Sequence, residues 1–159
     1  MTAAANKRNT VDPSDKGTKQ TRDIIRRETT VQRLMKEERK RGNRNVHDLE
    51  RAASEIEGVY TAITRRLWVK TSTLERVDAS EPLAPLQWLV IAHKDRYLPW
   101  TEALKTTGFN AQQIITDVVV DDWSLGEVAQ ARGRDAQFIK RTVLSGLKLY
   151  ANLAGWGRK

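Results

Sequence analysis

The chain has 159 residues and no cysteine, with 28 Lys and Arg against 20 Asp and Glu. Its length is that of one ordinary domain, and the lack of cysteine excludes disulfides and thiolate metal sites. No apolar run approaches the roughly 20 residues that span a bilayer, and the first ten residues have no apolar core of a secretory signal. We therefore expect a cytoplasmic, nucleoid-associated protein with no membrane partner.

The positive charge is concentrated at the two ends of the chain. The net charge is +7 over residues 1–45, −2 over residues 46–120 and +3 over residues 121–159. A basic end attracts polyanions through counterion release, and nucleic acid is the commonest such partner. A charged tail that aids solubility is the alternative interpretation. The distribution favours double-stranded DNA as the partner.

The N-terminal third of the chain is polar and divides into two parts. Residues 1–20 carry almost nothing that could be buried, so we expect a disordered basic tail. Residues 21–44 are predicted to be a basic helical arm, helical over 21–40 and ending near Gly42. Its sparse apolar residues leave open whether this helix is free or orders only on binding. We expect three arginines of the arm to contact DNA: Arg26, Arg27 and Arg33.

The middle of the chain predicts an amphipathic helix and then a helical domain. Within residues 45–80, apolar residues recur at steps of three and four from Leu49 to Leu67. Within residues 81–159, prolines open a buried apolar helix over 86–93, Pro99 breaks or kinks it, and Gly108 ends a short helix after it. Residues 111–120 fit a helix or a strand, and we predict a helix because no partner strand is evident. The expected fold class is an all-α helical bundle.

Residues 124–144 meet the physical demands of a helix-turn-helix. Ser124 and Glu127 have the spacing of a capping box at the start of a short first helix. Ala129 is a small residue where the two helices must approach. Gly133 follows four residues later, where a tight turn needs a positive φ. Asp135 is a candidate cap for the second helix, which would be the recognition helix.

The second helix divides into an inward and an outward face. The inward stripe is Ile139, Val143, Leu147 and Tyr150. The expected DNA-contacting residues are Arg134 in the turn and, on the outward face, Gln137, Lys140, Arg141 and Ser145. Gln reads adenine through two hydrogen bonds, and Arg or Lys reads guanine or binds phosphate. Leu144 falls on the same outward face, which argues that part of that face is buried.

Two family resemblances follow from these residues. The pattern S-L-x-E-V-A, then Gly133 and an apolar-spaced helix, resembles the helix-turn-helix of sigma-factor region four and related regulators. Residues 82–157 are similar to a C-terminal helical domain of unknown function in bacterial regulators. Gly133, Lys140, Leu147, Leu153-Ala154 and the closing Gly155-Trp156-Gly157 carry that similarity. Because that domain occurs in phage-derived regulators of gene transfer agents, the resemblance implies a phage-related role such as transcription activation.

No catalytic or metal site can be assembled from the sequence. His47 and His93 stand alone, and the adjacent acids Asp121-Asp122 and Glu37-Glu38 would point in different directions on a helix. We interpret them as caps and surface charge, and expect no enzyme activity, metal or cofactor. Of the five tryptophans most are expected in the core, with Trp156 the best candidate for an interface anchor.

The sequence therefore predicts a DNA-binding transcriptional regulator with a helix-turn-helix and a basic arm. One alternative is an adaptor that binds RNA polymerase, such as an antiterminator or co-activator. Another is a viral DNA-packaging subunit that assembles as a ring. A homodimer is compatible with the regulator, because dimeric helix-turn-helix proteins bind two half-sites.

Overall fold

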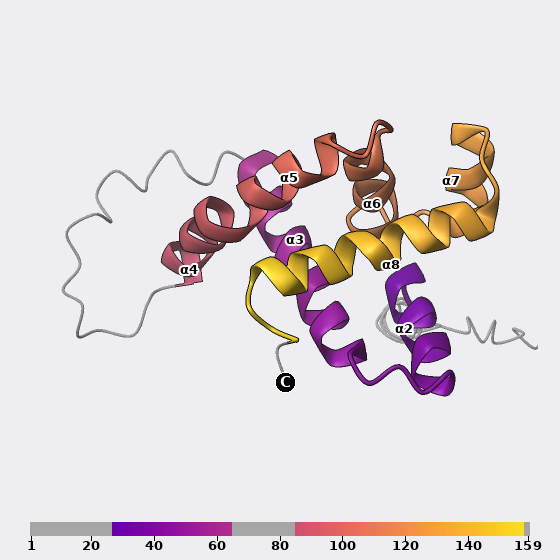
Figure 1. Ribbon diagram of the computed structural model, residues 1–159, viewed down its shortest axis with the longest axis horizontal. Coiled ribbons are helices and arrows are strands. Elements are labelled where there is room, and N and C mark those ends of the chain that lie inside the picture. The colour runs from indigo at the N-terminus through magenta and orange to yellow at the C-terminus, as the bar shows by residue number, and fades with distance from the viewer. Residues whose placement is uncertain (1–26, 65–84, 158–159) are drawn as a thin grey trace, which may run out of the picture.

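A computed structural model describes residues 27–64 and 85–157, and the regular elements of these two ranges are all helical (Figure 1). The elements are α2 (Thr30–Lys40), α3 (Val46–Thr64), α4 (Pro85–Ala92), the π-helical turn η2 (His93–Tyr97), α5 (Leu98–Lys105), α6 (Ala111–Val119), α7 (Leu125–Arg132) and α8 (Ala136–Leu153). The predicted all-α class is confirmed, as is the helix over residues 111–120. None of the described helices has the length and apolar character needed to cross a membrane. The predicted tail over 1–20 and residues 65–80 of the predicted amphipathic helix and linker lie outside the described residues.

Helix α8 is the element on which most of the others assemble. It contacts α3, α5, α6 and α7, and in Figure 1 its yellow ribbon crosses the front of the molecule with α7 at one end. The predicted inward stripe is confirmed, because four of its apolar side chains are fully buried: Ile139, Val143, Leu147 and Tyr150. Half-buried Leu144 agrees with the expectation that part of the opposite face is covered.

Gly146 sets the close approach of α8 to α6. A Cβ atom at this position would lie 2.2 Å from Cδ1 of Ile115, closer than packed carbon atoms allow. The carbonyl of Gly146 also accepts a hydrogen bond from Nε1 of the fully buried Trp100, at 2.9 Å. The two helices are therefore in contact because residue 146 has no side chain. The sequence analysis assigned this glycine no role.

Helix α2 belongs to the core. Leu34 and Met35 are 2% and 0% exposed and pack in the same cluster as α3, α6 and α8. A capping box between Thr29 and Gln32 begins the helix, so the expected helical start near residue 21 is wrong for residues 27–29. The described part of the arm packs on the rest of the protein, and the burial of Leu34 and Met35 contributes to that packing.

The N-terminus of α2 is tied to the loop that precedes α7. The backbone N–H of Thr30 donates to Oδ1 of Asp122 at 2.6 Å. Asp122 has a φ of 55°, which is uncommon outside glycine and is tolerated best by Asp and Asn. The prediction that Asp122 serves as a cap is confirmed, and the helix that it caps is α2.

A π-helical turn accommodates Pro99. Pro99 lies in the first turn of α5, and the backbone N–H of Leu98 donates to the carbonyl of His93, five residues back. A proline in an uninterrupted α-helix would clash with the carbonyl four residues before it, and the wider turn avoids that clash. The predicted interruption at Pro99 is therefore present as a local widening. Helix α5 ends at Lys105, and Gly108 follows with a φ of 74°.

A buried charge cluster fixes the C-terminal half of α8. Glu55 of α3 is 2% exposed, and Nη1 of Arg96 lies 2.8 Å from both of its carboxylate oxygens. The hydroxyl of Tyr150 donates to Oε1 of Glu55 at 2.7 Å. Burial, followed by the hydrogen bond and charge of Glu55, raises the pKa of Tyr150. The three side chains join α3, η2 and α8 at one point.

Candidate nucleic-acid interface

Helices α6, α7 and α8 form a three-helix unit in which each helix contacts the other two. The backbone N–H of Glu127 donates to Oγ of Ser124 at 3.2 Å, and the N–H of Ser124 donates to Oε2 of Glu127 at 2.7 Å. Hydrogen bonds from the backbone N–H and from the side chain of Ser124 lower the pKa of the Glu127 carboxyl. The predicted capping box is confirmed, and it begins α7 at the expected residue.

The turn between α7 and α8 has the predicted left-handed residue. Gly133 has φ 59° and ψ 39°, and the N–H of Arg134 donates to the carbonyl of Ala129 at 2.9 Å. No atom would lie within 4 Å of a Cβ at Gly133, so the backbone conformation alone favours glycine there. Asp135 occupies the N-cap position of α8, but its side chain makes no capping hydrogen bond, so that part of the prediction is wrong.

Arg132 ties the end of α7 to α6. Its Nη2 lies 2.7 Å from Oδ2 of Asp117, whose side chain is 6% exposed. The other oxygen of Asp117 accepts from Nε2 of Gln113 at 2.9 Å. A helix-turn-helix commonly has apolar residues near the turn, and here a partly buried ion pair holds the first two helices together. No sequence pattern identifies Asp117 as the partner of Arg132.

Helix α8 leaves a polar ridge exposed between its two packed flanks. The ridge consists of Gln137, Arg141, Ser145 and Lys148, all exposed. The predicted residues Gln137, Arg141 and Ser145 are thus brought together on one face. Lys148 continues their spacing of three and four residues, and the sequence analysis missed it although that spacing would have found it.

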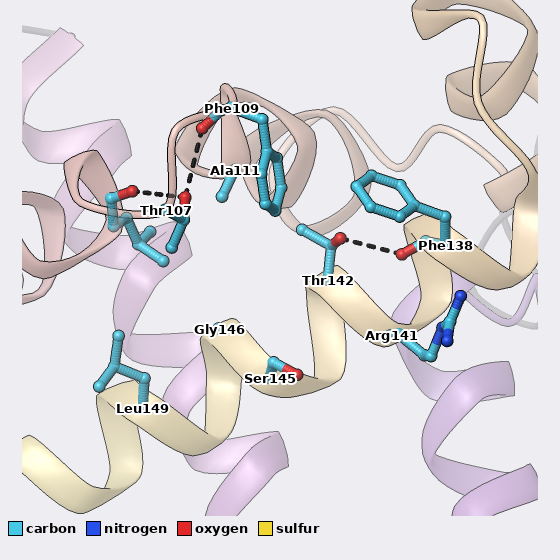
Figure 2. Close-up of a pocket in the computed structure, with 10 residues that line it drawn as sticks. Thr107, Phe109, Ala111, Phe138, Arg141, Thr142, Ser145, Gly146 and Leu149 are labelled. Carbon is cyan, nitrogen blue, oxygen red and sulfur yellow. Dashed lines mark hydrogen bonds between the residues drawn. The ribbon is translucent and has the colours of Figure 1, made fainter.

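Arg134 and two aromatic rings flank the N-terminal part of this ridge. Arg134 is exposed, and its guanidinium carbon lies 5.2 Å from the ring centroid of Phe138. Figure 2 shows Phe109 and Phe138 facing each other, with Arg141 and Ser145 on the neighbouring turns of α8. The two ring centroids are 5.2 Å apart. They border an open, mainly apolar cavity of about 390 Å³ beside α8.

The expectation that Lys140 lies on the outward face is wrong. Its side chain is 7% exposed, and its Nζ lies 2.7 Å from Oε2 of Glu37 on α2. The hydrogen bond and charge of Lys140 lower the pKa of Glu37. The flank of α8 that carries Lys140 is covered by α2, so its methylene stem is buried while its ammonium reaches a carboxylate. Lys140 joins two helices and is unavailable to a nucleic acid in this arrangement.

The predicted arm residues have different positions. Arg27 and Arg33 are exposed, whereas Arg26 lies outside the described residues. Arg27 is close enough to α7 for its charge to contribute to the lowered pKa of Glu127. Arg33 belongs to the docked helix α2. Arg27 and Arg33 therefore lie on the surface of the folded part of the protein.

Trp156 is occupied by contacts within the chain. The guanidinium carbon of Arg51 lies 4.0 Å from its ring centroid, and that of Arg96 lies 5.4 Å away. Tyr150 adds a ring contact at 6.2 Å between centroids. These contacts place Trp156 beside the buried Glu55 cluster, and its role as an interface anchor stays a prediction.

Within the described ranges 27–64 and 85–157, no group of three or more His, Asp or Glu side chains is arranged to hold a metal ion. Comparison of the chain with protein-family models, with curated proteins and with solved structures finds no match.

Proposed function

We propose that this protein is a DNA-binding transcriptional regulator that places the N-terminal half of α8 in the major groove. The observation that carries this proposal is the exposed ridge of α8, presented by a three-helix unit with a left-handed glycine at its turn. A helix-turn-helix uses its second helix in this way, with the N-terminal residues contacting base edges. The major groove is about 12 Å wide and admits a helix with its side chains.

The chemistry of the ridge suits recognition of base edges. Gln137 and Arg141 are separated by one helical turn and point to the same side. A glutamine amide pairs with N6 and N7 of adenine, and a guanidinium pairs with O6 and N7 of guanine. Neither Arg134 nor Arg141 forms an ion pair with another described residue. Arg134, which is exposed in the turn, would contact a backbone phosphate.

The distribution of charge supports an anionic partner. The whole chain carries a net charge of +8, and residues 1–26 contribute +3 of it. Counterion release by such a segment would add affinity that depends on salt and not on sequence. Arg27, which lies just before α2, and Arg33, within α2, are both exposed and would add to this salt-dependent affinity.

The experiment is selection of binding sites from a randomised duplex pool, followed by fluorescence anisotropy with the selected site. The Gln137→Ala, Arg141→Ala double variant should bind at least tenfold more weakly, since each good pair with a base contributes about 1–3 kcal/mol. Its melting temperature should equal that of the parent, because both side chains are exposed. Lys94→Ala, an exposed change on η2, is the matched control. Equal affinity of the double variant and the parent would refute the proposal.

A protein-binding adaptor is the second candidate, and one observation favours it. Trp88 and Ile91 of α4 are 37% and 38% exposed, on the same side of that helix. Large apolar side chains that are exposed side by side on one helix face are typical of a contact with another protein, such as a polymerase subunit. A pull-down with and without nuclease separates the candidates: partners retained after nuclease favour the adaptor, and their loss favours DNA.

A further inference from the structure

A small notch with both polar and apolar lining lies between the α2–α3 turn and the ridge of α8. It has a volume of about 160 Å³ and is lined by Asn43, Asn45, Leu49, Leu144, Ser145 and Lys148. Ser145 and Lys148 belong to the ridge, whereas Asn43 and Asn45 belong to the turn. A segment about 100 residues earlier in the chain therefore flanks the surface that the proposed function assigns to DNA.

Two exposed cations belong to the segments that form the notch. Arg44 is exposed between the two asparagines and Lys148 is exposed on α8, and neither forms an ion pair with another described residue. One carboxylate is near: Oε2 of Glu38 accepts from Nδ2 of Asn43 at 3.2 Å. Arg41 lies 3.6 Å from Oε1 of the same group and compensates its charge. Lys148 and Ser145 line the notch itself, and Arg44 belongs to the turn whose two asparagines line it.

The dimensions of α8 place this notch at the edge of a bound groove. Lys148 follows Gln137 by eleven residues, which corresponds to roughly 16 Å along a helix. The major groove is about 12 Å wide. In a complex in which α8 runs across the groove and Gln137 reaches a base edge, Lys148 and the α2–α3 turn would lie beside the sugar-phosphate backbone that borders the groove.

We propose that the notch binds one backbone phosphate of the duplex, with Lys148 and Arg44 as the cations and Ser145 as a hydroxyl donor. This inference rests on the proposed function and adds to it a contact that fixes how deeply α8 enters the groove. Contacts to phosphates set the position and register of a protein on DNA without reading sequence. The α2–α3 turn thereby has a role in DNA binding that the sequence analysis assigned only to the residues before it.

The first test measures the affinity of the full chain for its selected duplex over a range of salt concentrations. Lys148→Gln and Arg44→Gln should each lower the slope of log affinity against log salt by about one, because each removes one phosphate contact. Both should weaken binding to selected and unrelated duplexes by the same factor. Lys94→Gln, on η2, should leave the slope unchanged.

The second test locates the phosphate. Methylphosphonate linkages, which carry no charge, are introduced one at a time along the flank of the selected site. One linkage should weaken binding of the parent and have no further effect on Lys148→Gln, which shows that the two changes remove the same contact.

Three results would overturn the inference. Unchanged salt slopes for both variants, together with weak binding by Gln137→Ala, Arg141→Ala, would refute the phosphate contact and leave the proposed function standing. Altered sequence preference in Arg44→Gln would show that the turn reads bases. A parent protein that binds no duplex would refute both proposals.

Discussion

The two halves of α8 differ in what surrounds them, although they belong to one continuous helix. The C-terminal half carries Leu147 and Tyr150, both fully buried, and its Gly146 touches α6. The N-terminal half also buries Ile139 and Val143, but it presents Gln137 and Arg141 to solvent. Both halves are anchored in the bundle, and the N-terminal half also carries the residues proposed to read bases.

This difference explains how an exposed interface can be rigid. A side chain positions a base contact only if its own backbone is fixed, and sites built on well-packed helices are more precise than sites on loops. The Glu55 cluster and Gly146 fix the C-terminal half of α8. The ridge therefore projects from a helix whose orientation is fixed. Stability and recognition should then respond to substitutions in different halves of the same element.

The largest effect should come from removing α2. Deletion of residues 1–40 removes Leu34 and Met35 from the core and exposes Lys140, so the shortened chain should lose its cooperative melting transition. Deletion of residues 1–26 spares both side chains. That shorter deletion should leave the melting temperature unchanged and reduce the salt dependence of DNA binding. Cooperative melting of the chain that lacks residues 1–40 would show that α2 is dispensable for folding.

Breaking the anchor of the C-terminal half should be the next largest effect. Glu55→Ala leaves the Arg96 charge and the Tyr150 hydroxyl without their buried partner, so it should lower the free energy of unfolding by about 3 kcal/mol. Glu57→Ala, an exposed change on the same helix, is the control and should have little effect. Urea denaturation of both variants checks the expectation. Equal midpoints for the two variants would show that the cluster contributes nothing.

Gly146→Ala should be destabilising through overpacking. The added methyl group meets Cδ1 of Ile115, and inserting a methyl group into a well-packed core costs about 1–3 kcal/mol. Ile115→Val removes that atom, so the double variant should recover part of the loss. A double-mutant cycle measured by urea denaturation gives the coupling between the two sites. Strictly additive losses would mean that the two helices are not in contact at these residues.

Two glycines of the helix-turn-helix should respond in opposite directions. Gly133 has a left-handed conformation that a β-branched residue opposes, so Gly133→Val should cost about 1–3 kcal/mol and weaken DNA binding. Gly126 lies inside α7 with open space around it, so Gly126→Ala should be neutral or stabilising by up to about 1 kcal/mol. The melting temperatures of Gly133→Val and Gly126→Ala, measured against that of the parent, test this expectation. A parent-like melt for Gly133→Val, or a sharp drop for Gly126→Ala, would contradict the observed turn.

The sequence predicted the parts of this structure that depend on local signals. The Ser124–Glu127 capping box and the Gly133 turn each involve residues within one or two turns of the chain, so their spacing alone identifies them. The buried stripe from Ile139 to Tyr150 follows from helical periodicity in the same way. The outward face of α8 was predicted from the same periodicity and is right for Gln137 and Arg141.

Contacts between distant segments could not be predicted. Glu55 is separated from Arg96 by 41 residues and from Tyr150 by 95, and Lys140 is 103 residues from Glu37. In isolation Glu37, Glu55, Arg96 and Lys140 each resemble a surface charge. The position of α2 decides which flank of α8 is covered, and the sparse apolar residues of α2 gave no indication that it docks there.

The most direct test of the account compares base preference in the parent and in Arg141→Ala. Each position of the selected duplex is replaced in turn, and the affinity of both proteins is measured for every replacement. The account predicts that Arg141→Ala loses about 1–3 kcal/mol of discrimination at one or two adjacent base pairs and keeps the parent's preference elsewhere. Uniform weakening at every position, or an unchanged profile, would contradict the claim that the exposed half of α8 reads DNA.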